Sequence, residues 1–463
     1  MSCDLQCLRV RRCHGWSGCV VAGLLLGVLA WGLAGCQPPS ESREVETARR
    51  ATVREGASAA RYRLPEVGAV ASEPTMRVRV QARVAEVALE GGEWVHFDRA
   101  EGDDSFDDHL SLGSPVTVTH DGEQFQLRTG SRGYAWRTSR LRVRTGFPPS
   151  GIGLNGDRYP GVLELVALAG RDGRPTGRFD VVNHVPMETY LPGVLERELF
   201  GSWDLDAFKA QAIAARSYAL FERGLNADRH YDIQATTASQ VYGGAASNPK
   251  AIEAARQTRG MVLTHDGRVV PGFYSSCCGG LTQTATSAFP RFGNTLAITP
   301  LRGGVACDYC RASPNYRWGP IEREADVLAR RIAVWGELND DPVAALEGLR
   351  SVRMTHRSPA GRPARFEVVD ERGRRFMLPA EQFRFACNRM LVGEEGMGRE
   401  MQLLSSHVRV SVQGDRVRFD DGRGFGHGAG MCQWGTQGMA RAGYAGRAIV
   451  EHYYPDAEVR RVY

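Results

Sequence analysis

The sequence has no dense run of lysine and arginine with interleaved aromatic residues, and it has no internal repeat. The first absence argues against a nucleic-acid partner, because a nucleic-acid groove needs clustered positive charge. The second argues against a repeat architecture. The apolar run at residues 19–33 is too short to cross a bilayer, which takes about 20 residues. These absences leave a globular protein as the simplest interpretation.

What is present is an ordinary globular composition. The 463 residues allow roughly two to four structural units of ~150 residues each, with a sizeable core. Hydrophobic residues make up 42% and charged residues 24% of the chain, as in typical folded proteins. The net charge of +5 is small and scattered, so it suits anionic surfaces without selecting one of them.

The first 36 residues have the pattern of an export signal. Arg9, Arg11 and Arg12 form a basic start, and the apolar run that follows ends in small residues before Cys36. This ending resembles a bacterial lipobox, whose cysteine is lipidated and begins the mature protein. We therefore expect an exported lipoprotein anchored to a membrane through Cys36, with a plain signal peptide or an uncleaved anchor as alternatives. Gln37 after the cysteine favours the outer membrane or periplasm if the host has two membranes.

The rest of the chain divides into three parts by composition and pattern. Residues 37–75 are rich in Pro, Ser, Glu and Arg, which predicts a disordered tether. Residues 76–170 contain short alternating runs separated by Gly and Asp turns, which predict a small N-terminal β domain. Residues 171–463 carry segregated helical and strand patterns and predict the main body. The predicted fold class is therefore α+β.

The clearest helical pattern begins at Ser202 or Asp204, either of which can cap it, and runs to about residue 223. One narrow stripe of this helix is rich in alanine, which predicts close packing. Lys209 and Arg216 share another face, where they could meet substrate or carboxylates. Acidic residues before this helix are predicted to lie around a turn: Glu188, Glu196 and Glu198. Further helices are predicted at residues 249–258, 321–333 and 446–453.

Glu198 is the strongest candidate for acid–base chemistry. Its apolar neighbours are Leu199, Phe200 and Trp203. Partial desolvation by such neighbours would raise the pKa of the carboxyl toward that of a general acid. Glycosidic cleavage needs such an acid to protonate the leaving oxygen, and a lytic transglycosylase can manage with one carboxyl group. The alternative is a structural glutamate that caps the helix or pairs with Arg216.

Six cysteines remain beyond the signal and the lipobox: Cys277, Cys278, Cys307, Cys310, Cys387 and Cys432. The knuckle Cys307-x-x-Cys310 is typical of zinc sites, and Cys278 could add a third thiolate. A fourth ligand stays open among the other three cysteines. Disulfides, including one from Cys278 to either knuckle cysteine, are the competing interpretation, because an exported compartment favours them. Either arrangement would be structural.

Several short motifs follow one another along the chain. They are Tyr190-Leu191-x-Gly193-Val194 with Glu198, Ala207-x-Lys209-Ala210-Gln211-Ala212-x-Ala214-Ala215-Arg216-Ser217-Tyr218, Thr236-Thr237-x-x-Gln240-Val241-Tyr242, Tyr274-Ser275-Ser276 with Gly279-Gly280, Gly426-His427-Gly428 to Gln433-x-Gly435, and His452-Tyr453-Tyr454-Pro455. Each motif alone is weak evidence. In this order and spacing they resemble the SpoIID/LytB family over about residues 161–463, interrupted by a less familiar stretch at 320–413.

The resemblance implies a SpoIID-like body with peptidoglycan as its ligand. Sporulation members of the family are similar to lytic transglycosylases, which cut glycan strands stripped of stem peptides. LytB-type members resemble amidase enhancers, which need binding but no cutting. We expect lytic transglycosylation to 1,6-anhydro-muramyl ends, with no cofactor required for catalysis. The alternative is a non-catalytic glycan-binding protein that helps an amidase or a division or sporulation partner.

By motif position, the resemblance makes Glu198 the catalytic glutamate and Glu188 the runner-up acid. The expected substrate-binding residues are Lys209, Gln211, Arg216, Ser275, His427, Gln433 and Trp434. The indole of Trp434 offers a face for sugar stacking. A hydrogen-bonded core histidine is the alternative for His427.

The chain departs from the family pattern at two places. Ser275 stands where relatives carry a histidine. Some relatives bind zinc through Cys and His in the segment that corresponds to residues 232–240. Gln234, Ala238 and Ser239 occupy those places here, so that metal site is expected to be absent.

Overall fold

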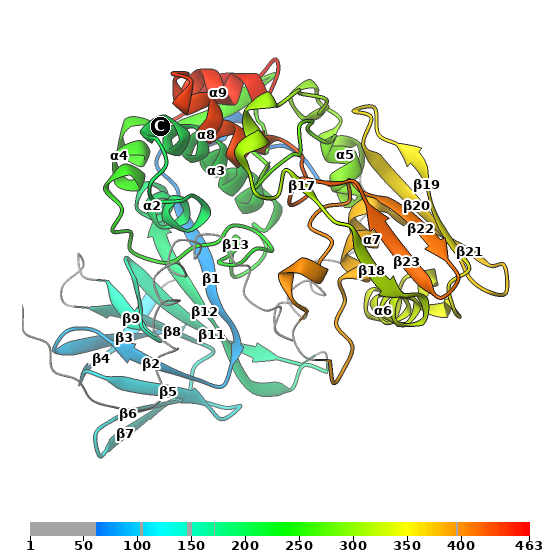
Figure 1. Cartoon of the computed structure of the whole chain (residues 1–463). Helices are drawn as coiled ribbons and strands as arrows, with labels where there is room; N and C mark the ends of the chain where they lie inside the picture. Colours follow the sequence, from blue (N-terminus) through cyan, green and yellow to red (C-terminus); the bar gives the residue numbers. More distant parts are fainter. Residues whose placement is uncertain (1–61, 102–104, 146–150, 171, 395–396) are drawn as a thin grey trace, which may run out of the picture. The chain divides into compact units, whose positions relative to one another are not determined.

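The computed structural model describes residues 62–463, apart from residues 102–104, 146–150, 171 and 395–396 (Figure 1). The predicted export signal with Cys36 and the first part of the predicted tether lie outside the described residues. Within the described residues, no helix has the length and apolar character needed to cross a membrane. Helices and strands both build the fold, which confirms the α+β class.

Residues 62–74, which the sequence assigned to the tether, pack on the body instead. Leu64 and Val70 are buried, and the Val67 N–H donates to the Gly267 carbonyl at 3.0 Å. Strand β1 (Thr75–Val84) begins directly after this segment. Burial of its few apolar side chains orders the segment, although its composition resembles that of a linker.

Two mostly antiparallel sheets follow, with the strand orders β13-β1-β12-β11-β8-β3-β4 and β10-β9-β2-β5-β6-β7. Their other strands are β2 (Glu86–Glu90), β3 (Trp94–Glu101), β4 (Ser105–Gly113), β5 (Val116–His120), β6 (Phe125–Thr129), β7 (Arg132–Trp136), β8 (Arg140–Thr145), β9 (Ile152–Leu154), β10 (Asp157–Tyr159), β11 (Val162–Ala169), β12 (Pro175–Pro186) and β13 (Ile233–Gln234). The predicted domain boundary at residue 170 lies between β11 and β12, which pair with each other. One sheet therefore runs across that boundary.

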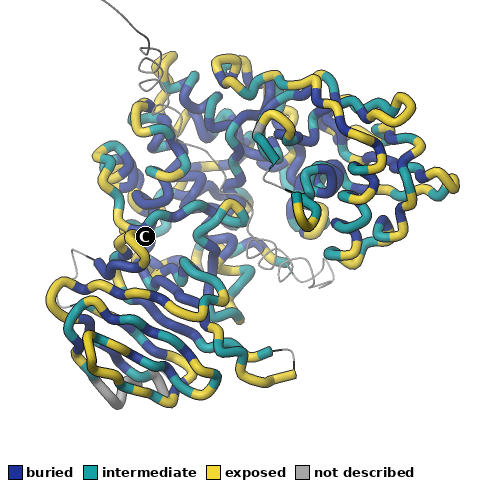
Figure 2. Tube along the Cα trace, turned by 60° about the horizontal axis from the view of Figure 1, so that its bottom comes forward, coloured by how far each residue is buried: buried dark blue, intermediate teal, exposed yellow. Residues whose placement is uncertain are grey.

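The two sheets share one apolar core. Residues along β5 alternate between buried and half-buried, as the period of two along a strand requires. Figure 2 marks the buried residues of the chain in dark blue. Phe125 on β6 meets Phe179 on β12 edge to face, with ring centroids 5.5 Å apart. This contact joins the inner faces of the two sheets.

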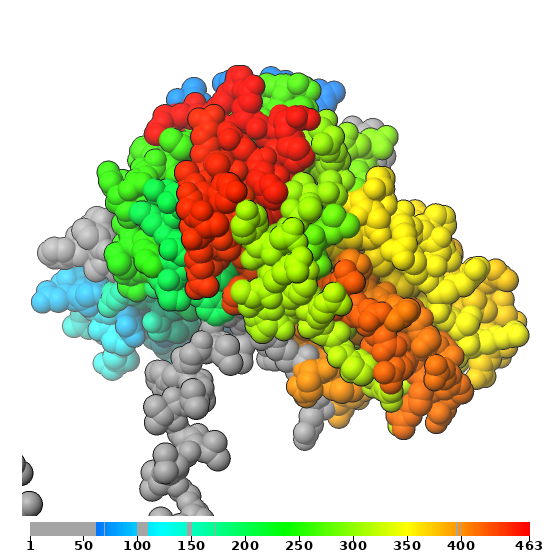
Figure 3. Space-filling view, turned by 45° about the horizontal axis from the view of Figure 1, so that its top comes forward, coloured from blue at the N-terminus to red at the C-terminus, as the bar shows by residue number. Residues whose placement is uncertain are grey.

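Strand β12 leads directly into a group of helices. They are α2 (Met187–Glu198), α3 (Leu205–Leu225), α4 (Pro249–Gln257), α8 (Gln433–Arg441) and α9 (Gly446–Tyr453). Helix α3 contacts each of the others, and its alanine stripe is buried, as the sequence predicts. Figure 3 shows the C-terminal segment between the green helices and the yellow-green segment near residue 310.

The acidic residues that were predicted to lie around a turn are on helix α2 instead. Pro192 lies inside this helix and cannot donate a backbone hydrogen bond. Leu191, Val194 and Leu195 are fully buried, and α2 packs against α3 and α4. Tertiary packing thus outweighs the local turn signal of Pro192 and Gly193.

Short strands complete the body around these helices. They are β14 (Met261–His265), β15 (Arg268–Val269), β16 (Tyr274–Ser275), β25 (Met431–Cys432) and β26 (Glu458–Arg461), with the one-turn helix α5 (Ala285–Ala288). Strand β16 pairs in parallel with β25, so the motif at Tyr274 lies directly beside the motif that contains His427 and Gln433.

The less familiar stretch, together with residues 414–420, forms a subdomain with its own apolar core. Its elements are β18 (Ile321–Glu324), α6 (Ala325–Asn339), β19 (Ser351–Arg357), β20 (Pro363–Val369), β21 (Arg375–Pro379), α7 (Ala380–Cys387), β22 (Arg409–Gln413) and β23 (Arg416–Asp420). Strands β17 (Arg317–Trp318) and β24 (Gly422–Arg423) pair where the chain enters and leaves it. The helix predicted to begin at residue 321 begins at Ala325, because residues 321–324 pair with β23.

Candidate functional site

Glu198 is the last residue of α2, where the chain turns into extended Leu199. The Val241 N–H donates to Glu198 Oε1 at 3.1 Å, and Gln433 Nε2 donates to Glu198 Oε2 at 3.2 Å. Val241 lies in the loop after β13, and Gln433 is the first residue of α8. Segments far apart in the sequence therefore hold one half-buried carboxyl group.

Tyr274 on β16 adds a further hydrogen bond to the Glu198 carboxyl. The Tyr274 hydroxyl accepts a hydrogen bond from Gln240 Nε2 at 3.1 Å. Gln240 Oε1 in turn accepts one from the Tyr190 hydroxyl at 3.0 Å. Because Tyr190 and Gln240 are fully buried, this chain of hydrogen bonds gives the carboxyl a fixed support.

Tyr274 and Gln240 were not among the predicted site residues. Both occur in the motifs that carry the family resemblance, so the sequence contained a signal for them. The hydrogen bonds of Tyr274 to Gln240 and to Glu198 join segments that are far apart in the sequence, so they could not be read from motif spacing.

Burial raises the pKa of the Glu198 carboxyl above its ordinary value. The hydrogen bonds from Val241, Gln433 and Tyr274 act in the opposite direction and only partly offset this effect. A carboxyl with a raised pKa keeps its proton to higher pH, which is what a general acid requires. The side chain is half-buried, so its proton is not sealed in the core.

Glu188, the runner-up acid, lies at the other end of α2 in a different environment. Arg216 donates from Nη2 to Glu188 Oε2 at 2.7 Å and from Nε to Oε1 at 2.9 Å. The Tyr463 hydroxyl and the Gly260 N–H also donate to this carboxylate. Burial acts to raise the pKa of Glu188, but the hydrogen bonds and charge of Arg216 hold it below its ordinary value.

This pairing corrects three expectations. Glu188 is an ionised anchor and does not have the raised pKa of a general acid. Arg216 is fully buried and bound to Glu188, so it does not present its guanidinium to a substrate. The alternative in which Glu198 pairs with Arg216 is also not what the structure contains.

The other predicted polar residues of α3 and β16 lie in different surroundings. Gln211 and Ser275 are buried, and the Gln211 amide and the Ser275 hydroxyl find no hydrogen-bond partner among the described residues. Lys209 forms an ion pair with Asp206 at 3.4 Å and lies beside Gly446 at the start of α9. Gln433, another predicted substrate-binding residue, donates a hydrogen bond to Glu198.

His427 lies in the Gly-rich loop before β25. Its Nδ1 accepts a hydrogen bond from the Ala429 N–H at 3.0 Å, and its ring packs on Phe289 with centroids 4.8 Å apart. Burial lowers the pKa of His427 to about 4, so the imidazole is neutral at neutral pH. A hydrogen bond to the Tyr274 backbone ties it to β16. It is a neutral hydrogen-bonding group beside the strand that carries Tyr274.

Trp434 follows Gln433 and is half-buried in a small aromatic cluster. Its ring centroid lies 5.4 Å from that of Trp203 and 5.9 Å from that of Phe200. Its backbone N–H donates to the Ser276 carbonyl at 3.0 Å, which fixes the start of α8 against the loop after β16. The apolar neighbours that the sequence placed beside Glu198 thus pack on the helix that carries Gln433.

The cysteines predicted to bind metal or form disulfides come together in the core. The group comprises Cys278, Cys307, Cys310 and Cys432, and we call it the cysteine cluster. Its four sulfur atoms lie within 4.8 Å of one another, and all four residues are buried. Among the described residues no disulfide is formed. Of the three candidates left open for a fourth ligand, Cys432 is the one that joins the other three.

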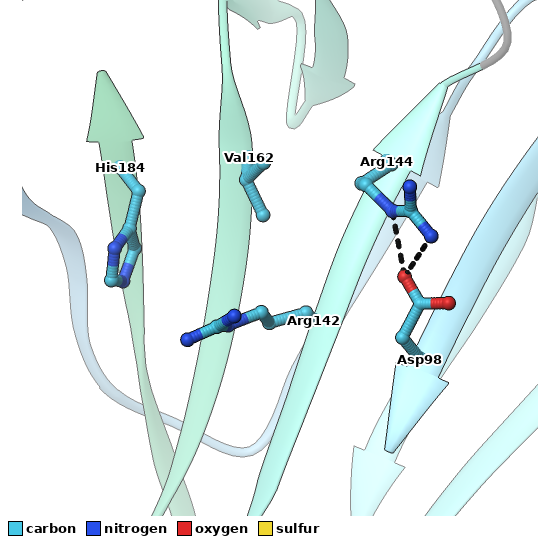
Figure 4. A pocket seen from close by; sticks show the side chains of 5 residues that line it. All are labelled: Asp98, Arg142, Arg144, Val162 and His184. Carbon is cyan, nitrogen blue, oxygen red and sulfur yellow. Dashed lines mark hydrogen bonds and ion pairs between the residues drawn. The ribbon is translucent and has the colours of Figure 1, made fainter. Parts of the chain in front are cut away.

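A hollow of about 280 Å³ lies elsewhere, on the larger N-terminal sheet (Figure 4). It is lined by Asp98, Arg142, Arg144, Val162 and His184. Arg144 donates to Asp98 at 2.7 Å, and His184 lies 3.0 Å from Glu164. These carboxylates offset the positive charge of the hollow, and none of the predicted site residues lines it.

Comparison with known proteins bears on the segment that contains Glu188, Glu198 and Gln240. A family model described as SpoIID, stage II sporulation protein, matches residues 176–265. This match runs from β12 through α2, α3 and α4 to β14. Tyr274, His427 and Gln433 lie beyond it.

Relatives extend the similarity over more of the chain. An uncharacterized protein of Brachyspira hyodysenteriae is 29% identical over 317 residues, covering 67% of this chain and 74% of that protein. The stage II sporulation protein D of Bacillus subtilis is 24% identical over 295 residues, covering 60% of this chain and 75% of that protein. The amidase enhancer of Bacillus subtilis is 24% identical over 302 residues, covering 57% of this chain but only 39% of the enhancer.

Proposed function

Because the chain belongs to the SpoIID/LytB family, we propose that it acts on the glycan strands of peptidoglycan as a lytic transglycosylase. The observation that carries the proposal is the environment of Glu198, a half-buried carboxyl group with a raised pKa. Val241, Gln433 and Tyr274 hold this group in one orientation. Strands without stem peptides are the favoured substrate.

In the proposed reaction Glu198 first acts as an acid and then as a base. It donates its proton to the bridging glycosidic oxygen while the bond from that oxygen to C1 of the muramic acid breaks. The resulting carboxylate then takes the proton of the 6-hydroxyl on the same muramic acid. The 6-oxygen bonds to C1, which gives a 1,6-anhydro end and regenerates the acid without consuming water.

The surroundings of α2 support a mechanism with a single carboxyl group. Glu188 is committed to Arg216. Glu196 accepts hydrogen bonds from the Ser247 hydroxyl at 2.8 Å and the Ser247 N–H at 2.7 Å. Of Glu188 and Glu198, the pKa is lowered in the first and raised in the second. A hydrolase would normally use a second carboxylate to activate water or to form a covalent intermediate.

A second candidate is a non-catalytic protein that binds glycan and stimulates an amidase. The similarity to a protein named amidase enhancer favours it. So does the geometry of Gln433, whose Nε2 also donates to the Glu198 carbonyl at 3.3 Å. Glu198 therefore also joins α2 to α8, which is a structural role that needs no chemistry.

We propose that the protein lies at the cell envelope, anchored by lipid on Cys36. The basic start, the apolar run and the small residues before Cys36 support this location. The variant Cys36→Ala should move the protein from the membrane fraction to the soluble fraction. A variant that stays with the membranes would contradict lipid anchoring.

The experiment incubates the full chain, purified in detergent, with intact and with amidase-stripped peptidoglycan. Mass spectrometry of the soluble products should find anhydro-muramyl fragments, with a higher yield from stripped strands. Glu198→Gln should release none above background, while its circular dichroism and its co-sedimentation with sacculi stay unchanged.

The same experiment separates the two candidates. Binding to sacculi without fragments from the wild type, together with stimulation of an added amidase, would replace the transglycosylase proposal with the enhancer. Fragments from the wild type that persist in Glu198→Gln would remove Glu198 from the chemistry. Fragments with hydrolysed, non-anhydro ends would indicate a hydrolase.

A further inference from the structure

The cysteine cluster gathers side chains from three separate segments. Cys278 follows β16, and Cys432 ends β25. Cys307 precedes a short 3-10 helix (Asp308–Ala312) that contains Cys310. The Sγ atoms of Cys278 and Cys310 are 3.8 Å apart. We propose that this cluster binds one structural Zn²⁺ ion through four thiolates. The proposal is independent of the glycan chemistry, because metal content is measured whether or not strands are cut.

The sulfur positions fit a tetrahedral zinc site. A tetrahedron with Zn–S bonds of about 2.3 Å has sulfur–sulfur edges of about 3.8 Å, which matches the Cys278–Cys310 separation. All four sulfurs lie within 4.8 Å of one another, so they surround one point. Disulfides would join sulfurs in pairs and would not require four of them to converge. Four protein ligands leave no open position for water, which makes the ion structural.

Hydrogen bonds around the cluster suit negatively charged sulfur. The Cys278 N–H and the Gly435 N–H donate to Cys432 Sγ at 3.2 Å and 3.4 Å. The Tyr453 hydroxyl lies 3.0 Å from Cys307 Sγ. Such donors stabilise and orient thiolate ligands. A Cβ atom at position 435 would collide with Cys307 Sγ and the Tyr453 hydroxyl, so Gly435 lets α8 approach the cluster.

A buried cation lies against the same segment. Arg362, in the subdomain, is fully buried and donates from Nη1 to the carbonyls of Cys278 at 3.0 Å and Leu281 at 2.8 Å. Its Nε and Nη2 find no hydrogen-bond partner among the described residues. A Zn²⁺ ion with four thiolates carries a net charge of −2, and a fixed cation beside a ligand residue offsets part of it.

The metal would also hold the start of α8, from which Gln433 donates its hydrogen bond to Glu198. Cys432 is the N-cap of α8, and its sulfur accepts a hydrogen bond from the Gly435 N–H. Gln433 is the next residue along the chain. An ion bound to Cys432 therefore holds the start of α8 against the loop after β16. The ion would therefore position Gln433 at the Glu198 site and would take no part in the chemistry.

The test measures metal in the full chain, purified in detergent without chelators. Inductively coupled plasma mass spectrometry should find about one zinc ion per chain. Exchange for Co²⁺ should produce thiolate-to-cobalt charge-transfer absorption and the visible bands of a tetrahedral site. Cys278→Ser and Cys432→Ser should each lower the zinc content by more than about tenfold. Cys387→Ser is the matched control and should keep its zinc, because Cys387 is buried in the separate core of the subdomain.

Two outcomes would overturn the proposal. One is a wild-type protein without zinc that also fails to develop the cobalt spectrum. The other is a non-reduced peptide map in which Cys278 is disulfide-bonded to Cys307 or Cys310. If the serine variants do not fold, the wild type still decides the question. A strong chelator should then expose all four cluster cysteines to alkylation together, while Cys387 stays protected.

Discussion

The two ends of helix α2 hold carboxyl groups in opposite electrostatic environments. At the start of the helix, Glu188 is bound by fully buried Arg216, and its pKa is lowered. At the end, Glu198 is bound by neutral donors, and burial raises its pKa. The helix is the same and both side chains are partly buried, so the difference comes from the partner groups. A cation makes an anchor, whereas neutral donors leave a carboxyl that can carry a proton.

The largest expected effect comes from breaking the anchor. Glu188→Gln leaves the Arg216 guanidinium buried without its counter-charge, so the free energy of unfolding should fall by about 3 to 5 kcal/mol. Glu198→Gln should change it by less than about 1 kcal/mol near neutral pH, because it removes no ion pair. Urea unfolding of both variants followed by circular dichroism measures the difference. Equal losses in the two variants would contradict the comparison.

The pH dependence of stability should have opposite signs at the two ends. Because the folded-state pKa of Glu198 lies above the reference value of 4.5, its contribution is full below that pH and is lost as pH rises through the folded pKa. Because the folded-state pKa of Glu188 lies below 4.5, its contribution is present above that pH and is lost as pH falls. Each unit of difference between the folded and unfolded pKa changes the free energy of unfolding by about 1.4 kcal/mol.

Unfolding series on the two glutamine variants between acidic and neutral pH measure these slopes. Relative to wild type, Glu198→Gln should gain stability as pH rises above 4.5. The cost of Glu188→Gln should grow over the pH range in which Glu188 ionises. Parallel profiles for the two variants would mean that the environments do not differ as described.

A smaller effect should follow from removing one neutral donor. The Tyr274 hydrogen bond acts to lower the pKa of Glu198, so Tyr274→Phe should raise that pKa. The alkaline limb of the pH–rate profile should shift to higher pH by up to about one unit. Tyr309→Phe offers a matched control, since that hydroxyl is bonded to Tyr444. A downward shift in Tyr274→Phe, or the same shift in both variants, would contradict the assigned role.

The smallest effect is expected at Glu196, the third acid of the helix. Its hydrogen bonds to Ser247 lie at the exposed surface. Glu196→Gln should change the free energy of unfolding by less than about 0.5 kcal/mol and should leave fragment release unchanged. A large loss of stability or of fragment release would contradict the comparison. It would show that a negative charge at any position of α2 has this effect, whatever its environment.

The sequence predicted the local pattern of this region better than its contacts. Helix α3 was expected from its alanine stripe and from a cap at Ser202 or Asp204. It is observed at Leu205–Leu225 with Asp204 at the N-cap position, although the Asp204 side chain makes no capping hydrogen bond. Helix α2 was missed because Pro192 and Gly193 are strong local turn signals, whereas the stabilising contacts to α3 and α4 are tertiary.

The candidate site shows the same division. Motif resemblance selected Glu198 and Gln433, but their hydrogen bond spans 235 residues of sequence. No spacing rule assigns Arg216 to Glu188 rather than to Glu198. Among the cysteines, the knuckle was visible from its spacing, while Cys432 lies 154 residues from Cys278 and was one of three equal candidates. Partners at such separations depend on strand pairing and helix packing, which only the fold supplies.

The most direct test of the central claim is the pH dependence of kcat/KM for fragment release from amidase-stripped peptidoglycan. This quantity reports the ionisation of the free enzyme. If Glu198 is the acid, the rate should fall with rising pH through an apparent pKa above 4.5, and Tyr274→Phe should move that pKa upward. A rate that rises with pH through this range would mean that an ionised group does the work, and it would contradict the account.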